Sequence, residues 1–143
     1  MADNMKFKFN PTKEGITKVL GPLEAEIMQV VWQMGQATVS DVHRVLQSRR
    51  DIAYTTVMTT MSRLQAKNIL KRTRVGLSYV YSPAMPKDEF ANAIVKSVLD
   101  SLSQEFGDST FRYIVEYVQS SDEKRLAAFE AAVKERRGAK AKA

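Results

Sequence analysis

The stretch from Ala53 to Lys67 constrains the fold of this chain most, because its two sides differ in chemistry. Helical periodicity places its apolar side chains on one stripe, which consists of Val57, Met61 and Leu64. The other side carries short hydroxyl groups and a guanidinium, from Thr55, Thr56, Thr59, Ser62 and Arg63. We therefore predict a helix with one face in a core and a polar face of unusual composition.

The polar face differs from an ordinary solvated surface. Threonine is a mediocre helix former, and a helix selected for solubility usually carries Glu, Lys and Gln instead. Short hydroxyl side chains keep a helix slim enough for the major groove of DNA, and arginine can bind guanine through two acceptors. This composition favours a DNA-recognition helix over the alternative, a helix whose threonines pack against a neighbouring segment or a protein partner.

The distribution of charge supports the same interpretation. The whole chain has a net charge of +6, which alone says little. Residues 49–74, however, hold seven basic side chains and one acidic one, whereas residues 84–133 hold five basic and nine acidic ones. The simplest account is a protein with two parts, of which the basic one binds a polyanion and the other has a different task.

Two shorter helices are expected before the Thr-rich one. Pro22 suits the first position of a helix and Gly35 suits its stop. Thr38 and Asp41 have the spacing of a capping box for a second helix, which runs to about Gln47. The first helix buries Leu23, Ile27, Val30 and Val31, with Trp32 and Met34 completing the core, and the second buries Val42, Val45 and Leu46. The second of these helices and the polar-faced helix after it, joined by a tight turn, form a helix-turn-helix pattern.

A basic hairpin is expected next. Residues 69–74 and 79–82 read as strands, with a Gly-containing turn over residues 75–78. Lys71, Arg72 and Arg74 are then placed to meet phosphate, as in the wing of a winged helix. The alternative is a hairpin that only closes the core, with solvated arginines.

The C-terminal part reads as three amphipathic helices after a boundary at Pro83 and Pro86. We expect the first helix to end at Gly107, the second to begin at Asp108 or Ser109, and the third to be capped by Ser120 with Glu123. Three helices in about fifty residues expose more apolar surface than they can bury alone, so we expect a homodimer rather than a monomer with helices folded back. The expected dimerisation residues are Phe90, Ile94, Val98, Leu102, Phe106, Phe111, Ile114, Val115 and Val118.

The expected fold class is mostly α: an N-terminal winged helix-turn-helix with a small β-hairpin wing, and a C-terminal three-helix dimerisation segment. The corresponding domains are an N-terminal arm (1–19), either loose or ordered on contact with DNA, the DNA-binding domain (20–83), the dimerisation domain (84–137) and a disordered tail (138–143).

The sequence lacks the residues that several classes of function require. The chain has no cysteine and one histidine, His43, which we expect to face solvent or contact the backbone. There is no Gly-rich phosphate loop and no carboxylate pair in an apolar setting. We expect no enzymatic activity, no catalytic residue, no metal and no cofactor. The apolar runs are far shorter than the roughly 20 residues that span a bilayer, and residues 1–10 lack the apolar stretch of a secretory signal, so we expect a cytoplasmic protein with no membrane partner.

Residues 20–28, Trp32, Thr38-Val39, Ala53 to Val57, Arg63-Leu64 and the hairpin from Gly76 to Tyr81 resemble the BlaI/MecI family of penicillinase repressors, to which copper-responsive repressors are related. The resemblance implies a homodimer that binds a palindromic operator in double-stranded DNA and blocks transcription. It also implies a recognition helix over Tyr54 to Leu64 and a wing over Arg72 to Tyr81. The expected DNA-binding residues are Tyr54, Thr55, Thr56, Thr59, Ser62, Arg63, Lys67, Lys71, Arg72 and Arg74.

The chain lacks the sequence features through which members of this family respond to their inducing signals. Antibiotic-responsive members are inactivated by a protease at an Asn-Phe bond in the dimerisation segment, and this sequence contains no Asn-Phe pair; the approximate register places Glu116-Tyr117 there. The cysteine motif of the copper-responsive relatives is absent as well. The resemblance therefore predicts a repressor without defining its inducer. A winged helix that docks a protein instead of DNA is the competing hypothesis.

Overall fold

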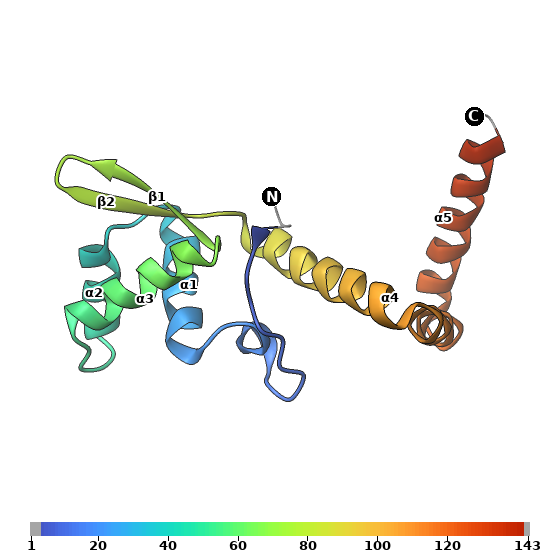
Figure 1. Cartoon of the computed structure of the whole chain (residues 1–143), viewed down its shortest axis with the longest axis horizontal. Coiled ribbons are helices and arrows are strands. Elements are labelled where there is room, and N and C mark those ends of the chain that lie inside the picture. Colours follow the sequence, from blue (N-terminus) through green and yellow to red (C-terminus); the bar gives the residue numbers. More distant parts are fainter. Residues whose placement is uncertain (1–3, 142–143) are drawn as a thin grey trace. The chain divides into compact units, whose positions relative to one another are not determined.

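Three helices and a two-stranded hairpin surround one hydrophobic core in the first part of the chain (Figure 1). The computed structural model describes residues 4–141 and divides into two compact units, residues 1–97 and 98–143. The elements are a 3-10 turn η2 (Gly15–Lys18), α1 (Pro22–Met34), α2 (Val39–Gln47), α3 (Tyr54–Ala66), β1 (Leu70–Val75), β2 (Ser78–Pro83), α4 (Lys87–Gln119) and α5 (Glu123–Ala141).

Helix α1 begins and ends where its sequence predicts. Pro22 occupies the first position, the Gly21 N–H donates to Glu24 Oε1 at 2.9 Å, and Gly35 ends the helix with a φ of 78°. Trp32 packs partly against the core, and its Nε1–H donates to the Met85 carbonyl at 3.0 Å. The expectation for Met34 was wrong: it is 46% exposed, because the helix ends with this side chain pointing away from the core.

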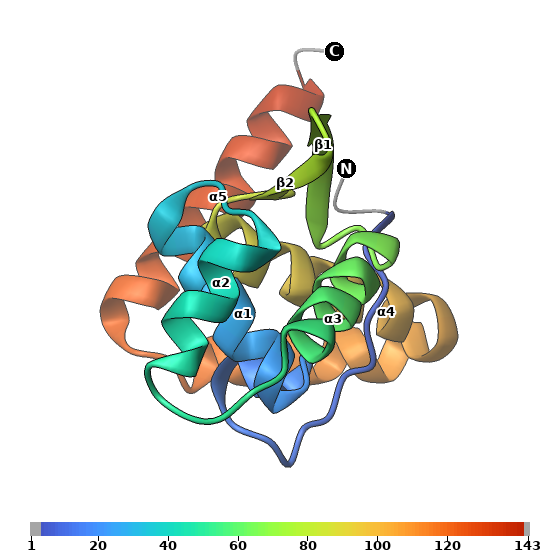
Figure 2. The same ribbon diagram turned by 90° about the vertical axis from the view of Figure 1, so that its left-hand side faces the viewer.

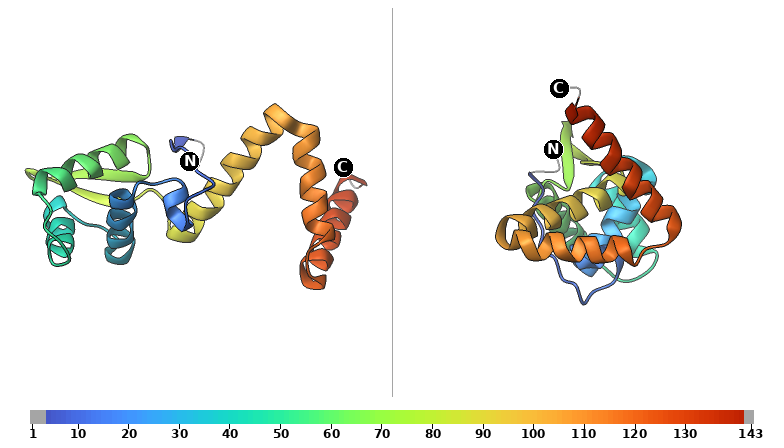
Figure 3. Two further views of the ribbon diagram at one scale, coloured as in Figure 1. Left: turned by 90° about the horizontal axis from the view of Figure 1, so that it is seen from below. Right: turned by 90° about the vertical axis from the view of Figure 1, so that its right-hand side faces the viewer.

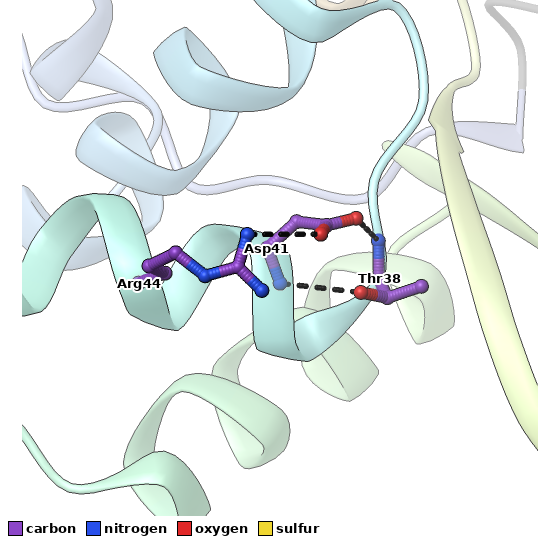
Figure 4. A network of polar contacts seen from close by, with 3 residues as sticks. All are labelled: Thr38, Asp41 and Arg44. Atoms are coloured by element: carbon purple, nitrogen blue, oxygen red, sulfur yellow. Dashed lines mark hydrogen bonds and ion pairs between the residues drawn. The ribbon is translucent and has the colours of Figure 1, made fainter.

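Helix α2 starts with the predicted capping box (Figure 4). The Asp41 N–H donates to Thr38 Oγ1 at 3.2 Å, and the Thr38 N–H donates to Asp41 Oδ2 at 2.9 Å. The backbone hydrogen bond from Thr38, then its side-chain hydrogen bond, lower the pKa of Asp41, and Arg44 at 3.9 Å acts in the same direction. The start of α2 is therefore fixed by local contacts.

Helix α3 packs against both α1 and α2 (Figure 2). Val57, Met61 and Leu64 are fully buried, which confirms the predicted core stripe. Thr60 is also buried, and its hydroxyl donates to the Thr56 carbonyl at 2.8 Å, so one threonine of the run belongs to the core. A buried hydroxyl that bonds the carbonyl four residues back needs no other partner.

The hairpin pairs antiparallel from Leu70 opposite Pro83 to Val75 opposite Ser78. Strand β1 begins one residue later than expected, and β2 begins one residue earlier. Gly76 takes the left-handed conformation of the turn, with a φ of 64°. A further bridge joins β2 to the α1–α2 connection, because Ala37 and Tyr81 exchange two backbone hydrogen bonds of 2.8 Å. The hairpin is thus attached to the helices at its base.

The N-terminal segment from residue 4 onward packs against the domain, in contrast to the loose arm that the sequence suggested. Met5 and Val19 are buried, and Phe7 lies against the core. The Lys6 N–H donates to the Lys67 carbonyl at 2.9 Å, which ties the segment to the end of α3. Residues 1–3 lie outside the described range.

The first unit extends past the boundary expected at Pro83 and Pro86. Phe90 and Ala93 at the start of α4 are buried, and the Phe90 ring lies 5.4 Å from that of Trp32. Phe90 is therefore a core residue of the winged domain, and its assignment to the dimerisation surface was wrong. Ile94 also packs partly on this core.

The first C-terminal helix breaks one residue before its expected end at Gly107. Helix α4 consists of two helical segments that meet at a sharp kink at Phe106, where φ is −134° and ψ is 45° (Figure 3). This confirms the predicted helix break beside Gly107. The cap of α5 is Asp122, which accepts the Arg125 N–H at 2.8 Å, and not Ser120. Residues 138–141, expected to be disordered, continue α5, and residues 142–143 are outside the described range.

Candidate nucleic-acid interface

The polar face of α3 forms an exposed ridge. Thr55, Thr56, Thr59 and Arg63 are exposed, and Ser62 is half-buried at its edge; we call these five residues the hydroxyl ridge. Met58 borders the ridge and is 44% exposed. Because the opposite stripe fills the core, the rigid domain holds α3 with its hydroxyl groups and one guanidinium toward solvent.

Tyr54 stands at the start of α3, in contact with α2. Its ring meets the ring of His43 edge-on, with centroids 5.6 Å apart. His43 Nε2 lies 2.8 Å from the Ile52 carbonyl, so it donates a hydrogen bond to the loop before α3. This confirms the expected backbone-contacting histidine and shows that it fixes the turn of the helix-turn-helix.

The two faces of the wing differ. Strand alternation places Arg72 and Arg74 on the same face as Tyr79 and Tyr81, because the cross-strand pairs are Arg72 with Tyr81 and Arg74 with Tyr79. The Arg72 guanidinium lies 4.4 Å from the centroid of the Tyr79 ring. Its hydrogen bond to the Tyr81 hydroxyl raises the pKa of Arg72. The ring of Tyr79 thus contacts the guanidinium of Arg72 in the free chain.

The remaining basic residues of the predicted set are dispersed. Lys71 lies on the opposite face of β1 from Arg72 and Arg74. Lys67 is at the end of α3, where its Nζ forms a 2.7 Å ion pair with Glu24 of α1. Arg74 Nε donates to the Gly76 carbonyl at 3.2 Å, at the tip of the wing. The structure therefore groups Arg72 and Arg74, and separates Lys67 and Lys71 from them.

Part of the basic segment is neutralised by α1. Arg50 pairs with Glu26 at 3.0 Å, just as Lys67 pairs with Glu24. Sequence reasoning missed both pairs, as well as Met58 and the contact between Tyr54 and His43. Periodicity alone does not show which basic residues face the acidic side chains at the start of α1.

An exposed ridge on the third helix and a basic hairpin after it define a winged helix-turn-helix protein. The model of the penicillinase repressor family matches residues 20–134. The chain therefore belongs to the penicillinase repressor family, a family of DNA-binding transcriptional repressors. This confirms the resemblance stated from the sequence, and the expectation of a non-enzymatic protein, because repressors are regulators.

Individual relatives match over part of the chain. The transcriptional regulator BlaI of Mycobacterium tuberculosis is 38% identical over 86 residues, which are 59% of this chain and 60% of that protein. The penicillinase repressor of Staphylococcus aureus is 24% identical over 79 residues, 55% of this chain and 63% of that protein. The chain thus spans about 60% of the length of the first of these relatives.

Two solved structures are similar to part of this chain. The solution structure of the DNA-binding domain of the repressor BlaI covers 54% of this chain and 93% of that domain, with 23% identity and a TM-score of 0.46. The Bacillus licheniformis BlaI monomer in complex with the blaP half-operator covers 49% and 85%, with 24% identity and a TM-score of 0.43. Within the described residues, no helix has both the length and the apolar character to cross a membrane.

Proposed function

We propose that this chain is a homodimeric, sequence-specific DNA-binding transcriptional repressor of the cytoplasm. The observation that carries the proposal is the hydroxyl ridge of α3, held out from a rigid core and followed by a wing with an arginine already oriented on Tyr79. A winged helix that docks a protein has no need of this basic wing. The family of the chain supports the same general function.

In this proposal the hydroxyl ridge enters the major groove. Arg63 is the residue suited to read a base, because a guanidinium can bind the O6 and N7 atoms of guanine together. The threonine hydroxyls of the ridge bond bases or nearby phosphates, and Tyr54 contacts the backbone at the start of the helix. These contacts position α3 and give it sequence preference.

The wing supplies phosphate contacts. Arg72 and Arg74 share one face, so both can approach the same stretch of DNA backbone. Lys71 points to the other face and Lys67 is paired with Glu24. We therefore narrow the proposed phosphate contacts of the wing to Arg72 and Arg74.

The second unit is proposed to form the dimer. Leu102 is 41%, Phe106 62% and Phe111 70% exposed, and Val98, Ile114, Val115 and Val118 are half-buried within a single chain. Apolar side chains in this number need a partner, and an identical subunit is the commonest one. Two-fold symmetry then requires an inverted-repeat operator, with recognition helices about 34 Å or a multiple of it apart.

The inducing step is proposed to differ from cleavage at an Asn-Phe bond. Glu116-Tyr117 takes that place in the approximate register, and Tyr117 is 77% exposed on α4. An inactivating protease that acted there would have to accept a Glu-Tyr bond.

The test is binding of the purified chain to the DNA upstream of its own gene and to a scrambled duplex, by fluorescence anisotropy across a salt series. We expect selective binding with a negative salt slope of about 0.9 per neutralised phosphate. Equal affinity for both duplexes would reduce the proposal to a generic basic surface. No binding at low salt would favour the protein-docking alternative.

A further inference from the structure

A cavity of about 630 Å³ lies between the N-terminal segment, the start of α1 and the end of α3. We propose that this cavity, which we call the arm cavity, binds a small organic anion, a carboxylate or phosphate group on an apolar body. All its lining residues belong to the first unit. Its size falls within the range of about 300–1,000 Å³ that is usual for small-molecule sites.

The charge of the lining selects an anion. Five lysines and one glutamate line the cavity. Glu24 is occupied, because Oε1 accepts the Gly21 N–H at 2.9 Å and Oε2 pairs with Lys67 at 2.7 Å. Lys18 donates to the carbonyls of Pro11 and Lys13. Within residues 4–141, by contrast, the ammonium groups of the three other lysines find no protein acceptor; these are Lys6, Lys8 and Lys13.

The start of α1 adds a second, independent attraction for an anion. Gly21 is the N-cap residue and has no side chain to accept a hydrogen bond from the first amides of this 13-residue helix. Gly21, Pro22 and Glu24 line the cavity, so the positive end of the helix dipole opens onto it. The start of α1 and the free ammonium groups therefore border one concave space.

The rest of the lining selects an apolar body. Val19 and Leu20 are buried core residues, and Phe7 packs partly against the same core. A fully hydrated ion such as free phosphate would leave this side of the cavity unfilled. An anion attached to an aromatic or aliphatic group satisfies both parts of the lining.

A bound anion would contact the end of the helix that carries the hydroxyl ridge. Lys67 is the C-cap residue of α3, its carbonyl accepts the Lys6 N–H, and its Nζ faces the cavity beside Glu24. Negative charge added there also reduces the attraction of the domain for DNA. This effect on DNA affinity rests on the proposed function, whereas binding to the cavity does not.

The test uses the full-length chain labelled with nitrogen-15 and three probes: 4-phenylbutyrate, phenyl phosphate and the neutral 4-phenylbutan-1-ol. We expect saturable amide shifts that cluster at Lys8, Gly21 and Lys67, with the alcohol binding at least tenfold more weakly than the better anion. The comparison of the two anions distinguishes a carboxylate from a phosphate site. Shifts confined to α4 and α5, or equal affinity for the alcohol, would overturn the proposal.

A pair of double variants localises the site. Lys8→Glu with Lys13→Glu should weaken binding of the better anion at least tenfold, whereas Lys124→Glu with Lys134→Glu makes the same change of net charge on exposed positions of α5 and should leave it unchanged. Unaltered binding in the first variant would contradict the assignment. If that variant instead loses operator affinity and the parent chain binds neither anion, the lysines contact DNA and the cavity is not a ligand site.

Operator binding is then measured by anisotropy with and without the better anion. We expect at least a threefold loss of affinity in the parent chain and none in the Lys8→Glu, Lys13→Glu variant. If an anion bound the cavity without changing operator affinity, the proposed effect of the cavity on DNA binding would be overturned. Failure to bind any DNA would overturn the proposed function and leave the probe titrations as an independent result.

Discussion

The guanidinium of Arg72 lies over the ring of Tyr79, 4.4 Å from its centroid, on the face of the wing that also carries Tyr81, its cross-strand partner. A cation stacked on an aromatic ring keeps its outward N–H groups available to a phosphate. The contact therefore presents an oriented donor on a hairpin that is otherwise exposed.

Replacement of Arg72 by alanine should weaken binding to operator and scrambled DNA by similar factors and reduce the salt slope by about 1, because the residue contacts phosphate. Anisotropy across a salt series measures both effects. Tyr79→Leu should give part of the same loss, since it removes only the ring that orients the arginine. A loss restricted to the operator would show that Arg72 reads a base.

Replacement of Arg63 by alanine should cost about 1–3 kcal/mol on the operator and much less on scrambled DNA, because the hydroxyl ridge places this guanidinium toward the groove. Arg125→Ala on α5 removes the same charge from an exposed helix and serves as the control. Equal losses on the two duplexes would reassign Arg63 to the phosphate backbone.

The capping box of α2 should contribute measurably to the free energy of unfolding. Thr38→Ala should lower the free energy of unfolding by about 1 kcal/mol, and Thr38→Ser by much less, because serine keeps the hydroxyl that accepts the Asp41 N–H. Urea unfolding followed by circular dichroism measures the difference. Equal losses for serine and alanine would point to packing of the threonine methyl group instead.

The same cap predicts a pH dependence. The pKa of Asp41 is lower in the folded chain than in the unfolded one, so its contribution is complete above the ordinary aspartate value of about 3.9 and is lost as the pH falls through the lower, folded value. Asp41→Asn should therefore remove part of the loss of stability on acidification, whereas Asp51→Asn in the exposed loop before α3 should not. If the free energy of unfolding fell equally with decreasing pH in the parent chain and in Asp41→Asn, this assignment would be contradicted.

The second unit should lose self-association when charge enters its apolar surface. Leu102→Asp should give a monomer by light scattering and weaken operator binding, because one half-site then binds alone. Leu77→Asp is the control, since Leu77 is 97% exposed at the wing tip and is still expected to leave the dimer intact. A Leu102→Asp protein that remains dimeric would move the interface elsewhere.

Local signals predicted the first three helices well. Pro22, Gly35 and the Thr38–Asp41 pair act within a few residues of themselves, so the bounds of α1 and the start of α2 could be found without tertiary information. The core stripe of α3 followed from periodicity for the same reason, and the family match supports the winged fold.

Contacts between distant segments could not be predicted in this way. Lys67 was grouped with the DNA-binding residues because it lies within the basic segment, yet its partner is Glu24, 43 residues earlier. The burial of Phe90 depends on Trp32, and the packing of the arm on Met5 and Phe7, through contacts that no spacing rule describes. The kink at Phe106, by contrast, lies beside Gly107, where local reasoning predicted a helix break.

The bridge between Ala37 and Tyr81 has a consequence for which DNA sequences such a protein would tolerate. Two hydrogen bonds fasten the base of the wing to the turn between α1 and α2, so only the tip around Gly76 can flex. With α3 in the major groove, the wing would then contact the flanking phosphate backbone at a nearly fixed distance from α3. Base steps that change the groove width at that distance would therefore change the affinity for DNA, although no side chain contacts those bases.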